Sequence, residues 1–137
     1  MQLDELYEYA ESRDIDVDWF LLNKLEAFSL PFDDGTCAIA IDPSKIASSA
    51  DEKVKLGHEI GHCETGSFYN RYSAMDVVAR HENRADKWEI KKLVPKDELD
   101  AAVANGRTEL WELAEIFGVT EDFMKKAVYY YRFGRLP

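Results

Sequence analysis

The residues His58-Glu59-Ile60-Gly61-His62 form an H-E-x-x-H motif, which constrains the fold of this 137-residue chain more than any other stretch. Residues four apart lie on the same face of an α-helix, so the imidazoles of His58 and His62 point the same way. Two neutral imidazoles at this spacing can each give one nitrogen to a Zn²⁺ ion at about 2.0–2.1 Å. Glu59 lies about 100° further round the helix, where it can act as a general base on a water rather than as a ligand. The motif therefore predicts a catalytic zinc site on a helix.

The residues around the motif favour a helix on which two glycines leave a smooth strip, a part of the surface without side chains. Ser49 to Glu52 has the S-x-x-E form of a capping box, which predicts the start of the helix. Gly57 and Gly61 each cost about 1 kcal/mol relative to alanine inside a helix. Because they are four apart beside the histidines, we expect another backbone to approach closely there. Two alternatives stay open: the glycines are merely tolerated, or the motif is an amphipathic helix with two partly buried histidines.

A catalytic zinc needs a third protein ligand and one open position. Phe68 occupies the place of the third histidine in the longer motif H-E-x-x-H-x-x-G-x-x-H, so this ligand must come from elsewhere. Glu82 is the best candidate, on a second predicted helix that begins near Val77, and His81 is its rival. Asp86 lies one turn further along the same face, where it can accept a hydrogen bond from the outer nitrogen of a ligand histidine. His81 is more simply explained as a half-exposed helix residue.

The chain resembles the ImmA/IrrE family of metallopeptidases, found in mobile elements, phages and bacterial regulators. The resemblance covers roughly residues 27–130 and is carried by H-E-I-G-H together with E-N-R-A-D-K-W-E-I-K-K-L-V-P, within Leu56–Cys63, Phe68–Asn70, Glu82–Pro95 and Trp111–Met124. It implies a compact zincin-like fold, with Zn²⁺ held by His58, His62 and Glu82 and with Glu59 as catalytic base. Characterised proteases of the family cut helix-turn-helix repressors. The resemblance therefore implies a zinc metallo-endopeptidase with a protein substrate of this kind.

The apolar patterns predict one α+β domain over residues 1–137, mostly helical, with a small antiparallel sheet before the metal helix. A helix is expected to about Arg13, then a brief strand at Ile15 to Val17 and a hairpin over residues 27–41. Further helices are predicted over 97–104, 108–117 and 121–131. The last two form a C-terminal helical pair.

Peptide hydrolysis also needs a hydrogen-bond donor for the tetrahedral oxyanion. Five residues near the two motifs are candidates: Tyr69, Tyr72, Arg80, His81 and Arg84. The sequence does not choose among them, and aromatic packing or surface charge explains each one as well.

The strand Thr36 to Ile41 comes just before the metal helix, and we expect it to form the upper edge of the cleft. Its residues Cys37, Ala38, Ile39 and Ala40 are small or apolar, which suits the close approach of an extended substrate backbone. The alternative is a strand paired on both sides within the core. The apolar run fits that arrangement too.

The helical pair at 108–131 resembles a helix-turn-helix but is poorly suited to bind DNA. Its second helix opens with Glu121 and Asp122, whose carboxylates repel the phosphates of a duplex. The net charge of −10 also disfavours binding to nucleic acid. We expect a degenerate pair that packs on the catalytic part or docks a protein partner. A DNA-binding module is therefore the weaker alternative. The other is a non-catalytic zinc-binding regulatory or toxin–antitoxin partner, against which the intact Glu59 argues.

The chain has no apolar run near the roughly 20 residues of a membrane helix and no apolar signal core at its N-terminus. We therefore expect a cytoplasmic protein without a membrane partner. Cys37 and Cys63 fit that compartment as buried or weakly reactive thiols.

Overall fold

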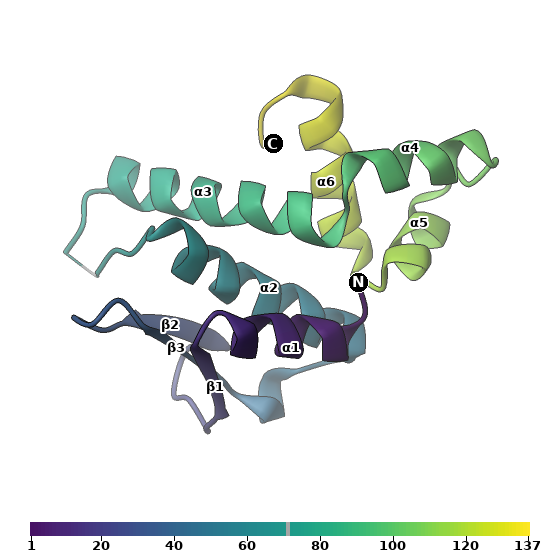
Figure 1. The fold of residues 1–137 in the computed structure, drawn as a ribbon. Helices are drawn as coiled ribbons and strands as arrows, with labels where there is room; N and C mark the ends of the chain where they lie inside the picture. Colours follow the sequence, from purple (N-terminus) through teal and green to yellow (C-terminus); the bar gives the residue numbers. More distant parts are fainter. Residues whose placement is uncertain (71) are drawn as a thin grey trace.

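The computed structural model describes residues 1–70 and 72–137 and has an α+β fold that is mostly helical, as predicted. A small sheet precedes the helix that carries the H-E-x-x-H motif, and a helical pair follows at the C-terminal end (Figure 1). The elements in chain order are α1 (Leu3–Ser12), β1 (Ile15–Trp19), β2 (Ala27–Pro31), β3 (Cys37–Ile41), the 3₁₀ turn η1 (Pro43–Lys45), α2 (Ser49–Thr65), α3 (Met75–Leu93), α4 (Lys96–Ala104), α5 (Leu110–Phe117) and α6 (Glu121–Phe133). Within the described residues, no helix combines the length and the apolar character that crossing a membrane requires.

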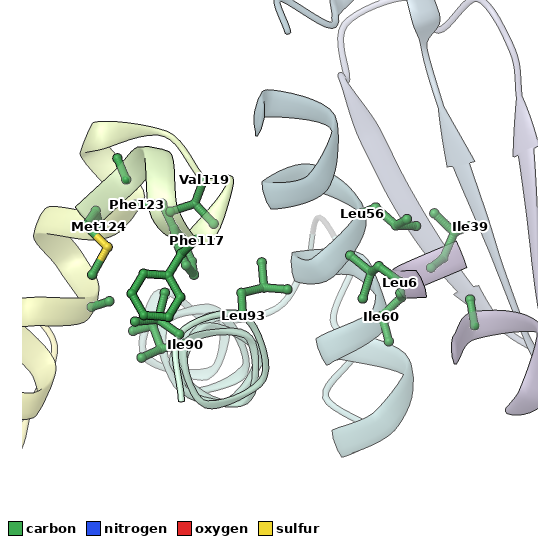
Figure 2. Close-up of a cluster of buried hydrophobic side chains, with 14 of the residues drawn as sticks. Leu6, Ile39, Leu56, Ile60, Ile90, Leu93, Phe117, Val119, Phe123 and Met124 are labelled. Carbon is green, nitrogen blue, oxygen red and sulfur yellow. The ribbon is translucent and has the colours of Figure 1, made fainter. Parts of the chain in front are cut away.

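Helix α2 is the central element of the fold. It lies between the sheet with α1 on one side and α3 on the other (Figure 1). Its residues Leu56 and Ile60 are fully buried and pack toward Leu6 of α1 and Ile39 of β3 (Figure 2). The H-E-x-x-H helix is therefore held on its apolar face by the core, which leaves the histidine face for α3.

The sheet has the order β1-β3-β2 and is mixed rather than purely antiparallel. The predicted hairpin is confirmed, because β2 and β3 are antiparallel and Ser29 lies opposite Ile39. The prediction is wrong for β1, which pairs with β3 in parallel. The physical reason is the connection after β1, which crosses the end of β3 and places β2 on its far side. The buried carboxylate of Asp42 fixes this crossing by accepting a hydrogen bond from the Leu22 N–H at 2.9 Å.

The C-terminal pair packs on the part of the chain that carries the predicted metal-site residues, as expected. Phe117, Val119, Phe123 and Met124 of this pair lie against Ile90 and Leu93 of α3 (Figure 2). The apolar core therefore continues from the sheet through α2 and α3 to α5 and α6. This packing fixes α3 from the side opposite to α2.

The two ends of α2 are set by local signals. The cap is Ser48, one residue before the predicted Ser49, and its hydroxyl accepts a hydrogen bond from the Asp51 N–H at 3.1 Å. The Asp51 carboxylate in turn accepts a hydrogen bond from the N–H of Ala47, the residue before the cap, at 2.9 Å. Gly66 ends the helix with φ 62°, a conformation that glycine adopts without strain.

Cys37 and Cys63 are joined by a disulfide, so the prediction of two free thiols is wrong. The sequence gives no sign of this pairing, because the cysteines are 26 positions apart and belong to a strand and a helix. The bond links β3 to α2 at the residue directly after His62. Disulfides are rare in a reducing cytoplasm, so the cysteines no longer support the predicted compartment.

Candidate metal centre

His58 and His62 lie one turn apart on α2 and direct one ring nitrogen each toward the same point. Their Nε2 atoms are 3.2 Å apart, and the rings meet edge to face with centroids 4.8 Å apart. His62 is buried, whereas the side chain of His58 is 22% exposed. The i, i+4 spacing of the motif thus produces the pair of imidazole nitrogens that the sequence predicts.

Glu82 of α3 completes a group of three possible metal ligands. Its carboxylate lies 2.8 Å from Nε2 of His58 through one oxygen and 3.1 Å from Nε2 of His62 through the other. Ligand atoms of a tetrahedral zinc with bonds of about 2.0–2.1 Å stand roughly 3.3 Å apart. The observed separations are close to this value, and two histidines with one glutamate form a known ligand set for catalytic zinc. The three residues therefore fit the ion that the motif implies.

The outer nitrogen of each histidine has its own hydrogen-bond partner. Nδ1 of His58 lies 3.1 Å from Oδ1 of Asp86, in the arrangement that the sequence predicts. Nδ1 of His62 lies 2.6 Å from the main-chain oxygen of Ser67. Because both acceptors lie at Nδ1, each neutral ring carries its proton there and leaves Nε2 free to bind a metal.

Glycines allow α3 to come close enough for these contacts. A Cβ atom on Gly61 would lie 2.8 Å from the main-chain oxygen of Ala85, a separation that real Cβ atoms do not show. A Cβ atom on Gly57 would lie 2.9 Å from Oε2 of Glu89. The smooth strip predicted beside the histidines is therefore confirmed as the contact surface for α3.

The carboxylate and the imidazoles of the group shift one another's pKa in the metal-free protein. Hydrogen bonds from His58 and His62 hold the pKa of Glu82 well below its usual range. Burial alone would lower the pKa of His58, but hydrogen bonds to Asp86 and Glu82 outweigh it and raise the pKa to about 10. The pKa of His62 is also raised, because its contacts with Glu82 and Ser67 outweigh burial. The group attracts positive charge, whether a proton or a metal ion.

Glu59 is buried beside the metal group without belonging to it. Burial raises the pKa of its carboxyl, and the positive charges of His58 and His62 offset part of this effect. A side-chain interaction with Ser29 of β2 also favours the ionised form. A carboxyl held in this way can exchange a proton nearer to neutral pH than an exposed glutamate.

Two cavities open beside these residues, with volumes of about 370 and 660 Å³. Both are lined by Leu25, Ala27, Glu59 and Glu82, so they are neighbouring parts of one cleft. The smaller part also takes in His62 and the aromatic side chains Phe28, Phe68 and Tyr69. The larger part is also lined by His58, Asp86 and Glu89.

The strand at the edge of this cleft is β2. The prediction is therefore wrong that the edge is formed by Cys37, Ala38, Ile39 and Ala40. These residues belong to β3, which has β1 on one side and β2 on the other. The alternative of a strand paired on both sides in the core is the correct one. Its continuous apolar run is typical of a strand covered by neighbours, whereas the free edge beside the cleft carries Ser29 and Pro31.

The candidate oxyanion donors lie in different places. Tyr69 lines the cleft and donates a hydrogen bond from its hydroxyl to Glu82 at 2.6 Å. His81 stacks against Tyr69 with ring centroids 6.4 Å apart and stays outside the group of ligand atoms found in the described residues. Tyr72 is 81% exposed, Arg80 pairs with Asp76 at 4.0 Å, and Arg84 is exposed. Among the described lining residues, Tyr69 is thus the candidate donor that faces the cleft.

Several residues of the site carry no clear signal in the sequence. Lys126 of α6 donates a hydrogen bond to Asp86 at 3.1 Å, across 40 residues of sequence. Ser67 acts through its main-chain oxygen, which every residue has. The αL glycine at Gly66, which turns the chain back toward His62, is the one signal that could have indicated it. The positions of Ser29 and the buried Glu89 in the site depend on strand order and on helix packing, which local sequence patterns do not specify.

Comparison with known proteins does not assign the chain to a family. A scan against models of protein families, a search of curated proteins and a search of solved structures each gave no match.

Proposed function

We propose that the chain is a zinc-dependent metallo-endopeptidase of the ImmA/IrrE type. The observation that carries the proposal is the meeting of His58, His62 and Glu82 in a cleft that Glu59 also lines. Bound zinc would supply Lewis-acid chemistry, which polarises a carbonyl and makes water a nucleophile near neutral pH. The remaining chemistry belongs to the side chains around the ligands.

Glu59 is the proposed proton carrier of the reaction. Its carboxylate takes a proton from the attacking water and delivers it to the nitrogen of the leaving amine. The raised pKa of Glu59 makes the carboxylate a stronger base than an exposed glutamate, and burial is the cause. The neighbouring Ser29 of β2 also favours the ionised form, with a smaller effect than burial or the two histidines.

Tyr69 is the proposed donor to the oxyanion. Its hydroxyl already lies within 2.6 Å of the ligand carboxylate of Glu82, so a small shift presents it to a bound carbonyl. The pKa of Tyr69 is raised to about 12 by burial and by Glu82, so the hydroxyl keeps its proton at neutral pH. A proton on the hydroxyl is the requirement for a hydrogen-bond donor.

The proposed substrate is a cytoplasmic protein, with a helix-turn-helix repressor as the expected class from the family resemblance. An extended segment of it would lie along the free edge of β2 and bond to its main chain. A cytoplasmic substrate requires the protein to work where disulfides are rare, so the Cys37–Cys63 pair is expected to be reduced there. Its redox state in cells, measured by trapping free thiols, therefore tests the compartment separately from the chemistry.

The experiment compares wild type with Glu59→Gln on a library of random synthetic peptides, with products read by mass spectrometry. The proposal predicts cleavage by the zinc-loaded wild type and zinc retention without cleavage by Glu59→Gln. Cleavage by Glu59→Gln at the wild-type rate would refute the mechanism. A wild type that keeps zinc but cuts nothing, including candidate repressors, would favour the non-catalytic zinc-binding regulator instead.

A further inference from the structure

Glu89 of α3 is an acidic residue buried without a partner. Its side chain is 1% exposed, and both carboxylate oxygens lack a hydrogen bond among the described residues. The carboxylate fills the space left by the missing side chain of Gly57, whose Cβ position is 2.9 Å from Oε2. Burial of an unpaired carboxylate is costly, so a buried acid normally has a counter-charge or a proton donor. For Glu89, the described side chains provide neither at hydrogen-bond distance.

The atoms nearest to Glu89 form a second set of possible ligands. Nδ1 of His58 is 3.8 Å from Oε1 of Glu89 and 3.1 Å from Oδ1 of Asp86. All three atoms lie within 4.8 Å of one another. The two measured separations bracket the roughly 3.3 Å expected between ligands of a tetrahedral zinc. His58, Asp86 and Glu89 also line the larger cavity, so the site borders this cavity although the Glu89 oxygens themselves are buried.

We propose that Nδ1 of His58 and the carboxylates of Asp86 and Glu89 form a second divalent-cation site, which zinc fills when it is in excess. The two carboxylates match the charge of one divalent ion. The site lies on the opposite side of the His58 ring from Glu82, because the two groups use different ring nitrogens. Binding of the second ion would release the Nδ1 proton of His58, and any proton on the buried Glu89 carboxyl, to solvent, and His58 would then be shared between the two sites. The inference is independent of peptide hydrolysis, although it shares His58 with the proposed zinc site.

Lys126 competes with the second ion. Its ammonium group lies 3.1 Å from the same Asp86 oxygen that faces His58. Glu59 and Glu82 line the same cavity and favour a cation, whereas Lys55 and Lys126 oppose one. The second ion must therefore displace Lys126 from Asp86, and it must share His58 with the first ion. Both effects make the second ion bind more weakly than the first.

The test titrates zinc into the metal-free full chain and measures bound zinc per chain by equilibrium dialysis and native mass spectrometry. Wild type is expected to bind one tight and one weaker equivalent. Glu89→Gln keeps the shape of the side chain, so it should retain the first equivalent and weaken the second by roughly tenfold or more. Glu98→Gln removes an exposed acid of α4 and should bind like wild type. Lys126→Met removes the competing charge and should strengthen the second equivalent by about tenfold.

Three results would overturn the second site: a wild type that binds only one equivalent in excess zinc, a Glu89→Gln variant with an unchanged second equivalent, or a Lys126→Met variant with no gain. Lys126 is partly exposed, so its variant keeps the inference testable if Glu89→Gln does not fold. A wild type that binds no tight equivalent of zinc would instead refute the zinc site of the proposed function. The two failures are therefore distinguishable in one titration.

Discussion

The carboxylate of Asp86 lies 3.1 Å from Nδ1 of His58, on the side of the ring away from the nitrogen that meets Glu82. This contact fixes the tautomer of His58, and Lys126 fixes Asp86 in turn. Asp86→Asn keeps the shape but loses the charge, so we expect zinc affinity to fall about 10- to 100-fold. Competition with a fluorescent chelator measures this. Asp100→Asn, an exposed acid on α4, is the matched control, and equal affinities in the two variants would contradict the role of Asp86.

The close approach of α2 and α3 predicts a difference between two glycine variants. Gly61→Ala places its methyl group 2.8 Å from a main-chain oxygen that cannot move independently. We expect a loss of about 1–3 kcal/mol in the free energy of unfolding, despite the gain of about 1 kcal/mol in helix propensity. Gly57→Ala meets the ends of the side chains of Glu89 and Leu93, which can shift, so its loss should be smaller. Urea denaturation compares them, and a fully stable Gly61→Ala would show that the helices are not in close contact.

The free edge of β2 predicts a pair of proline variants. Main-chain hydrogen bonds link Phe32 with Thr36 and Asp42 with Glu26. Bonded pairs alternate along an antiparallel ladder, so Phe28 bonds to β3 whereas the main chain of Ser29 faces the cleft.

Ser29→Pro should therefore lose peptide cleavage and keep its melting temperature and zinc, because proline is tolerated on an edge. Phe28→Pro should lower the melting temperature, because it removes a ladder bond. Ser29→Ala removes the hydroxyl but keeps the main-chain N–H. This variant should therefore keep most of the cleavage. Equal activity of Ser29→Pro and Ser29→Ala would argue against substrate binding along β2.

The raised pKa of His58 predicts how the stability of the metal-free protein depends on pH. The pKa is about 10 in the folded protein and about 6.5 in an unfolded chain. The imidazolium therefore stabilises the fold fully below about pH 6.5, and this contribution is lost as the pH rises toward 10. We expect a decrease on the order of 2–4 kcal/mol in the free energy of unfolding across this range in the presence of EDTA. His58→Gln should remove most of the decrease. An identical pH profile for this variant would assign the effect to other groups.

The parts of the site that local spacing specifies were predictable from the sequence. His58 and His62 meet because they are four apart, and Glu82 and Asp86 share a face of α3 for the same reason. The helices and the hairpin follow from apolar periodicity, with ends displaced by only a few residues. Local pattern and tertiary structure agree at these positions.

The parts that depend on the order of elements in space were not predictable. The edge was assigned to β3 because the sequence does not show that β1 lies along its other side. The Cys37–Cys63 disulfide and the Lys126–Asp86 contact join residues far apart in sequence. The burial of Glu89 likewise depends on how closely α3 approaches Gly57.

Zinc bound per chain after exhaustive dialysis tests the central claim most directly. Elemental analysis should find one zinc in wild type and in Glu59→Gln. It should find almost none in His58→Ala or Glu82→Ala, because each variant removes one of the three ligands that meet in the cleft. A wild type that retains no zinc, or a Glu82→Ala variant that retains it as well as wild type, would contradict the assignment of His58, His62 and Glu82 as a zinc site.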